Sequence, residues 1–321
     1  MSRYWAILLF ALLLAAAASL LRPVESLIEL RRTDPGLAWM LIEELRLPRT
    51  LLALGYGAVL GITGAALQAT FANPLASPDI MGSSSGAALG AVAGAYWLGI
   101  TGPLPLAACG AVGAALALAA LFLIAGRRSE TATLLLAGVA IALAAGAATS
   151  LLLALAPSPF AFYDSFEWLM GSFVDRSLPQ AAAALFPAAL ACILLARLAP
   201  ALDLMALGDD VAASVGYRPR RLAAEVVALS AVAVGACVSV CGAIAFVGLI
   251  APYAARSLTR GHPGQALVPA AAIGALLLLA ADLLVRLGPA GRAIPVGIVT
   301  TVLGTPLFIW IVARMRRTVA S

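Results

Sequence analysis

The chain has 321 residues, of which 63% are hydrophobic and 11% charged, and its mean hydropathy is +1.04. Soluble domains carry roughly 25% charged residues, so this composition excludes a soluble globular protein and indicates an integral membrane protein. The net charge of +5 does not indicate nucleic-acid binding, because the basic residues are spread over the ends of apolar runs and form no continuous stripe.

Ten apolar runs approach the roughly 20 residues that a helix needs to cross a bilayer. They cover residues 4–21, 51–70, 83–100, 104–125, 132–156, 181–199, 222–244, 246–258, 266–285 and 294–313. The sequence therefore predicts an all-α polytopic membrane protein of about ten transmembrane helices, in a single domain over residues 1–321. The first run also resembles a secretory signal peptide. We favour an uncleaved helix, because ten spans place both termini on one side of the membrane, as the charges also indicate.

All 20 basic residues are arginines, and their placement predicts the orientation of the chain. The side with more arginines is expected to be cytoplasmic, and it also holds both termini. Its arginines are Arg3, Arg127, Arg128, Arg197, Arg218, Arg220, Arg221, Arg256, Arg260, Arg314, Arg316 and Arg317. The opposite side has a smaller group, which includes Arg22, Arg31, Arg32, Arg46, Arg49, Arg286 and Arg292.

Two proline pairs, Asn73-Pro74 and Ser77-Pro78, interrupt the apolar sequence after the second run. Proline has no amide donor and restricts the residue before it, so a helix break is expected here. Broken backbone at membrane depth is tolerated only where protein or water satisfies its polar groups. The polar residues around the break either join helices by hydrogen bonds or mark the cytoplasmic end of a polar passage; they are Gln68, Asn73, Ser83, Ser84 and Ser85.

Glycines recur at every fourth position in the third run, at Gly82, Gly86, Gly90 and Gly94. This spacing places them on one helix face, where another backbone can approach closely. The second run has a similar face of small residues, formed by Gly57, Gly61 and Gly64. We therefore expect the second and third helices to pack together.

A second interruption falls in CGAIAFVGLIAPYAAR, Cys241 to Arg256, where glycines are again combined with a proline, Pro252. This interruption lies near the start of the last four helices, and Asn73-Pro74 lies near the start of helices two to five. Two similar blocks separated by an odd number of helices face opposite ways. The sequence thus predicts an inverted repeat of helices 2–5 and 7–10.

The longest cytoplasmic connection covers residues 200–221. Gly208, Asp209 and Asp210 are typical of a helix start, and Gly216 of a helix end. We expect a short amphipathic helix at the membrane surface. This loop is either a surface for a partner protein or a merely solvated connection.

On the outer side, Arg46, Arg49 and Arg286 lie at helix ends. Arginines at such ends commonly extend their head groups to the membrane surface, and Asp282 is placed to form an i,i+4 pair with Arg286. These arginines either serve those local purposes or dock another protein.

No catalytic motif is present. Cys109, Cys192, Cys237 and Cys241 lie in apolar runs with no nearby His or acid to complete a metal site, so we interpret them as core residues. His262 is the one histidine, and no phosphate-binding loop, zinc motif or nucleophile elbow occurs. The chain is therefore not expected to be an enzyme.

Several long motifs together resemble the permease subunits of type II ATP-binding cassette importers, the iron-siderophore, haem and vitamin B12 group. They are RLPRTLLALGYGAVLGITGAALQATFANPLASPDIMGSSSGA, ALGDDVAASVG, GAIAFVGLIAPYAAR and IPVGIVTTVLGTPLFIW, in order from Arg46 to near the end of the chain. The resemblance implies ten helices per subunit and two permease subunits around a central path. It also implies two cytoplasmic ATPase subunits, which bind ATP and Mg, and a periplasmic binding protein. The permease would bind no cofactor.

The resemblance also implies roles for particular residues. Outer arginines of the family meet glutamates of the binding protein, which assigns docking to Arg46 and Arg286, with Arg49 beside them. The segment in the coupling-helix position would contact the ATPase through Leu207, Gly208, Asp209, Asp210, Ala213 and Gly216. Independently of the resemblance, the glycine spacing and the proline breaks predict a region of helix packing and gating that includes Gln68, Asn73, Pro74, Gly82, Gly86, Gly90 and Pro252. Tyr253 stands where many relatives have His.

The sequence constrains the transported substrate less than the class of transporter. We expect a ferric siderophore or related iron chelate, then haem, then cobalamin. Since His262 is on the cytoplasmic side, a haem path built on histidine ligation within the membrane is disfavoured, although Tyr or Met could substitute. The alternative from another class, an ion-coupled secondary transporter, would need intramembrane carboxylates. The sequence offers only Asp282 and Glu225 as candidate carboxylates for ion coupling, and both lie near helix ends. An intramembrane enzyme is disfavoured because the sequence shows no His or acid pair within a span.

Overall fold

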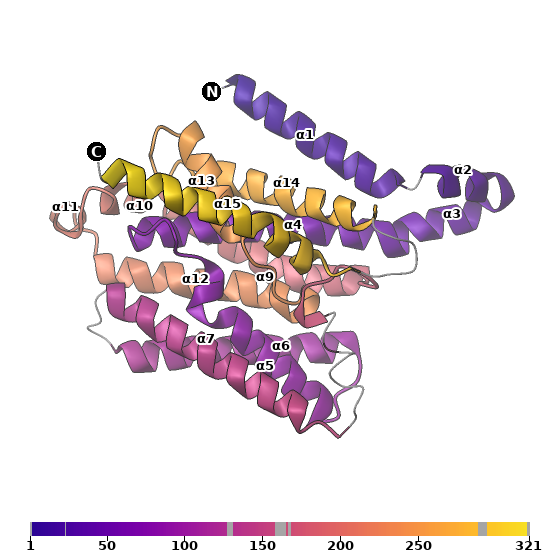
Figure 1. Ribbon diagram of the computed structural model, residues 1–321, viewed down its shortest axis with the longest axis horizontal. Helices are drawn as coiled ribbons and strands as arrows, with labels where there is room; N and C mark the ends of the chain where they lie inside the picture. Colours follow the sequence, from indigo (N-terminus) through magenta and orange to yellow (C-terminus); the bar gives the residue numbers. More distant parts are fainter. Residues whose placement is uncertain are drawn as a thin grey trace.

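The computed structural model describes residues 2–22, 24–126, 131–157, 165, 168–287 and 294–319. Its elements in chain order are α1 (Ser2–Leu21), α2 (Val24–Thr33), α3 (Pro35–Leu41), the π-helical η1 (Ile42–Arg46), α4 (Leu47–Thr70), the 3₁₀ helix η2 (Pro78–Met81), α5 (Ser83–Tyr96), α6 (Pro103–Ala125), α7 (Thr131–Ala154), α9 (Leu178–Arg197), α10 (Ala199–Met205), α11 (Asp209–Ser214), α12 (Pro219–Cys241), α13 (Val247–Leu258), α14 (Leu267–Val285) and α15 (Val296–Val319). The long helices lie roughly side by side in one bundle (Figure 1).

Each of the ten predicted spans corresponds to a helix of the structure, which confirms the all-α polytopic fold. Seven helical segments of the described chain are long and apolar enough to cross a membrane. Helices α5 and α13 are shorter, with 14 and 12 residues, because each follows one of the two breaks. The sequence did not predict the short helices α2 and α3, which extend beyond the bundle at the end opposite α11 (Figure 1).

The first helix of each half of the chain packs against helices of the other half. Helix α4, the first of the N-terminal repeat, packs against α13 and α14 of the C-terminal repeat. Helix α12, the first of the C-terminal repeat, packs against α5 and α6 of the N-terminal one. This reciprocal pattern agrees with the predicted inverted repeat of helices 2–5 and 7–10.

The prediction that the glycine faces of the second and third helices pack together is wrong. Gly86 and Gly90 of α5 lie against Gly113 of α6, whereas Gly57 and Gly61 of α4 lie against Gly274 and Ala270 of α14. A row of small residues allows close backbone approach but does not identify the partner helix. Gly82 is also not part of the helical row: it precedes α5 with φ +79°.

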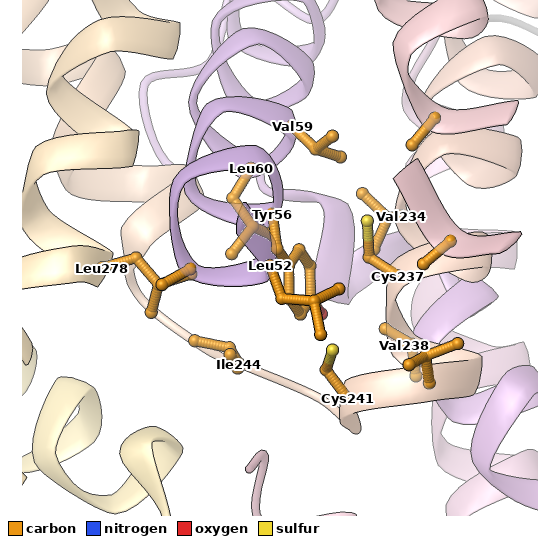
Figure 2. Close-up of a cluster of buried hydrophobic side chains, with 14 of the residues drawn as sticks. Leu52, Tyr56, Val59, Leu60, Val234, Cys237, Val238, Cys241, Ile244 and Leu278 are labelled. Carbon is orange, nitrogen blue, oxygen red and sulfur yellow. The ribbon is translucent and has the colours of Figure 1, made fainter. Parts of the chain in front are cut away.

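The core lies where α4, α9, α12 and α14 meet. Tyr56 is fully buried beside Leu52, Cys237 and Cys241, and its hydroxyl donates a hydrogen bond to the carbonyl oxygen of Gly242 at 3.2 Å (Figure 2). The two cysteines are completely enclosed. Their burial confirms the interpretation of Cys237 and Cys241 as core residues, whereas Cys109 and Cys192 are only partly buried.

Candidate functional site

The first break follows α4 and is built by a specific helix-ending motif. The Asn73 amide donates to the Gln68 carbonyl at 3.2 Å and the Ala72 amide to the Ala69 carbonyl at 3.3 Å. This is the Schellman pattern, with Ala72 at φ +45° in the position that glycine usually occupies. Asn73 Oδ1 then accepts a hydrogen bond from the Leu75 amide, and Pro74 prevents any return to helix. The predicted break at Asn73-Pro74 is thus confirmed.

Gln68 connects this break with the second half of the chain. Its side chain is 1% exposed, and Nε2 donates to the Leu249 carbonyl of α13 at 3.3 Å. Nearby, Pro252 supplies no amide to the Gly248 carbonyl, and this carbonyl contacts Gly64 of α4, where any Cβ would clash with it. Gln68 therefore acts as a hydrogen-bonding link between helices.

The second break does not fall at the proline. Pro252 lies inside α13, and the chain is irregular from Gly242 to Phe246 instead. Phe246 has φ +69°, and its ring packs edge-on against Phe308 of α15 with centroids 6.3 Å apart. The packing of this ring holds a backbone conformation that a non-glycine residue rarely adopts.

Two of the three arginines at this end, Arg49 and Arg286, pair with one carboxylate, and Arg46 lies near them. Asp282 is 1% exposed and pairs with Arg49 Nη2 at 2.8 Å and Arg286 Nη2 at 2.6 Å. Arg286 Nη1 donates to the Ser19 carbonyl at 2.6 Å, and Arg46 Nη1 donates to the Leu20 carbonyl at 3.0 Å. The cluster therefore joins the end of α1 to α4 and α14.

One ion pair of this cluster was predicted from the sequence and the other was not. The Asp282–Arg286 pair, four residues apart, is confirmed, whereas the pairing with Arg49 across 233 positions had no local signal. Burial lowers the pKa of the Arg286 guanidinium, and the nearby Asp282 carboxylate opposes this shift. Arg46 is only 8% exposed. Docking by these arginines stays a prediction.

At the opposite end, α11 is the predicted short helix of residues 200–221, whereas α10 before it was not predicted. Gly208 and Gly216 flank α11 with φ +114° and +97°, and Asp209 and Asp210 occupy its first turn. Leu207 is 67% exposed although it is apolar. A cavity of about 790 Å³ lies between α11 and the start of α12, lined by Asp209, Asp210, Ala213, Tyr217, Arg218 and Arg221 among others. An exposed leucine beside a charged groove is suited to contact another protein.

The comparisons with known proteins decide the family. The profile of the FecCD transport family matches residues 5–314. The chain belongs to the FecCD transport family. This membership confirms the resemblance to the permease family and favours it over the secondary-transporter and enzyme alternatives.

Individual relatives agree with this membership. The chain is 36% identical over 279 residues to the Fe(3+)-citrate import system permease protein YfmE of Bacillus subtilis, covering 84% of this chain and 81% of that protein. It is also 36% identical over 284 residues to the vitamin B12 import system permease protein BtuC of Citrobacter koseri, covering 87% and 84%. BtuC of Vibrio cholerae is 36% identical over 297 residues, covering 88% and 86%.

A solved structure has the same fold over nearly the whole length. It is described as an inward-facing conformation of a metal-chelate type ABC transporter, with a TM-score of 0.85 and 29% identity over 98% of this chain and 100% of that one. PsaBC from Streptococcus pneumoniae is related in fold alone, with a TM-score of 0.53 and 17% identity. The FecCD permease therefore has the architecture of a transport subunit.

Proposed function

We propose that this FecCD permease carries a ferric siderophore or related iron chelate from the periplasm to the cytoplasm, as a subunit of an ATP-binding cassette importer. The observation that carries the proposal is the family match over residues 5–314. Relatives named for Fe(3+)-citrate and vitamin B12 import support an iron chelate and keep cobalamin as the second candidate, with haem as a third.

The proposed assembly contains a second permease subunit, cytoplasmic ATPase subunits that bind ATP and Mg, and a periplasmic binding protein. The permease itself holds no cofactor in this proposal and hydrolyses no ATP. It lies in the bacterial inner membrane with both termini in the cytoplasm, an orientation supported by the arginine-rich end that also carries α11. Leu207, Asp209 and Asp210 would contact the ATPase.

The outer arginine cluster is proposed to orient the binding protein. Arg46, Arg49 and Arg286 converge on one small area, and charge complementarity at such a rim mainly guides association. Reversing Arg46 and Arg286 together to Glu should slow association of the binding protein by about tenfold or more at low salt. Unchanged association kinetics, with the permease still folded, would remove the docking role.

The proposal as a whole is tested by reconstitution. The tagged permease is purified with the proteins encoded beside it, inserted into liposomes with ATP inside, and supplied with radiolabelled ferric chelates or cobalamin outside. ATP-dependent import of a ferric chelate confirms the proposal, and import of cobalamin alone changes the cargo. Import that needs no ATPase subunit contradicts it.

A further inference from the structure

A carboxylate within the bundle was not recognised in the sequence. Asp79 belongs to η2, in the connection between the end of α4 and the start of α5. Helix α5 has only 14 residues, which at 1.5 Å per residue span about 21 Å of an apolar layer about 30 Å thick. This length places the segment before α5 within the apolar layer, and the purple connection in Figure 1 runs beside α12.

Asp79 lines a cavity of about 570 Å³ that both halves of the chain form. The first half contributes Ser84, Ser85 and Thr149, and the second contributes Ala243 and Ala245 of its break and Thr301 of α15. Transporters with inverted repeats place their cargo where interrupted helices of the two repeats meet. This cavity meets that description.

The Asp79 carboxylate is poorly satisfied within the described part of the chain. Its one hydrogen bond there comes from Ser84 Oγ at 3.5 Å, and no arginine pairs with it. Asp282, in contrast, forms ion pairs with two arginines. Ionisable groups within the membrane are costly and rare, and those that face an internal cavity mark pathways for substrates or ions.

We propose that Asp79 is a charged contact for the cargo in this cavity, and that it favours chelates presenting ammonium or N–H groups over polyanionic ones. This inference rests on the proposed function and narrows its substrate class. The walls supply hydroxyl groups from both repeats, but the carboxylate is the charged group among the lining residues. A ferric complex bearing several free carboxylates would be repelled at this point of the path.

The local field of Asp79 can be measured without knowing the cargo. In the purified permease, Ser85→Cys is modified by a cationic and an anionic methanethiosulfonate reagent of similar size, with Asp79 intact or as Asp79→Asn. The cation-to-anion rate ratio should fall about tenfold when the charge is removed. The chain with its four native cysteines alone gives the background.

Two controls distinguish charge from damage to the fold. Ser257→Cys, on the exposed cytoplasmic end of α13, should keep its rate ratio in the Asp79→Asn background. Asp79→Glu should retain the wild-type ratio at Ser85→Cys. An unchanged ratio at Ser85→Cys in Asp79→Asn, or equal ratios in Asp79→Glu and Asp79→Asn, would overturn the inference.

Import assays then separate this inference from the proposed function. A ferric trihydroxamate with a free ammonium group is compared with its N-acetylated form, using one binding protein throughout. Asp79→Asn should reduce import of the ammonium form severalfold more than that of the neutral form. Equal reduction of both forms would overturn the selectivity claim. Failure of the wild type to import any ferric chelate would contradict the proposed function, while the thiol measurement would still decide the role of Asp79.

Discussion

At the scale of single residues, the carboxylate of Asp282 holds two arginines at the end of α14. Asp282→Asn leaves Arg49 and Arg286 largely buried without their counter-charge. Breaking a buried pair in this way costs about 3–5 kcal/mol, so the unfolding midpoint in detergent should fall clearly. The end of α1, held through the Ser19 carbonyl, should become accessible to proteases.

The chain offers a matched control for that substitution. Arg221 and Glu225 form an i,i+4 pair of the same kind, but their side chains are 73% and 43% exposed. Exposed pairs contribute at most about 1 kcal/mol, so Glu225→Gln should hardly change the midpoint. Equal effects of the two substitutions would show that the Asp282 cluster is not a buried anchor.

Ala72 allows a prediction of the opposite sign. It holds the left-handed position of the Schellman motif that ends α4, and its side chain is exposed. Glycine adopts this conformation without the penalty of about 1 kcal/mol that a Cβ brings. Ala72→Gly should therefore raise the unfolding midpoint in a thermal scan, whereas Ala72→Val should lower it. A lower midpoint for the glycine variant would mean that the break is held by other contacts.

Not all of these residues could be found from the sequence. The Asp282–Arg286 pair follows from helical spacing, and the break at Pro74 follows from the chemistry of proline. The contact of Asp282 with Arg49 depends on how α4 and α14 pack, which no local pattern encodes. Asp79 escaped recognition because it lies between the apolar runs of residues 51–70 and 83–100, and hydropathy alone does not show that this connection enters the bundle.

At the scale of helices, the sequence predicted positions well and partners poorly. Apolar runs fix where a helix crosses the membrane, since length and hydropathy suffice for that. Small residues allow close approach of any helix, whichever one it is. The glycines of α4 and α5 therefore could not indicate that each helix packs on a different neighbour. Those neighbours follow from the way in which the first helix of each repeat packs against the other repeat.

The contact between α4 and α14 tests this packing. A Cβ at Gly61 would clash with the backbone of Ala270, so Gly61→Ala must push the two helices apart. We expect a loss of about 1–3 kcal/mol, as in other overpacked interiors, seen as a lower midpoint of unfolding in detergent. At Gly146 of α7 a Cβ meets no atom within 4 Å, so Gly146→Ala should be neutral or slightly stabilising. If both variants behave alike, the close contact of α4 with α14 is not a determinant of stability.

At the scale of the whole molecule, the two ends of the bundle differ in chemistry. The end with Asp282 is tied together by buried ion pairs, whereas the end with α11 exposes Leu207 and a charged groove. Between them, the two breaks share the Asp79 cavity. A transporter that changes shape as a rigid body needs such fixed surfaces for its partners around a path that can open.

The inner surface gives the last prediction. Asp209→Arg combined with Asp210→Arg reverses the charge of the first turn of α11, which the helix dipole also disfavours. The ATPase subunit should then bind the permease about tenfold or more weakly, and import per ATP hydrolysed should fall. Reversal of Glu43 and Glu44, two exposed acids near the outer end, makes the same change in net charge and should leave ATPase binding intact. Normal ATPase affinity in the α11 variant would place the coupling surface on another cytoplasmic loop.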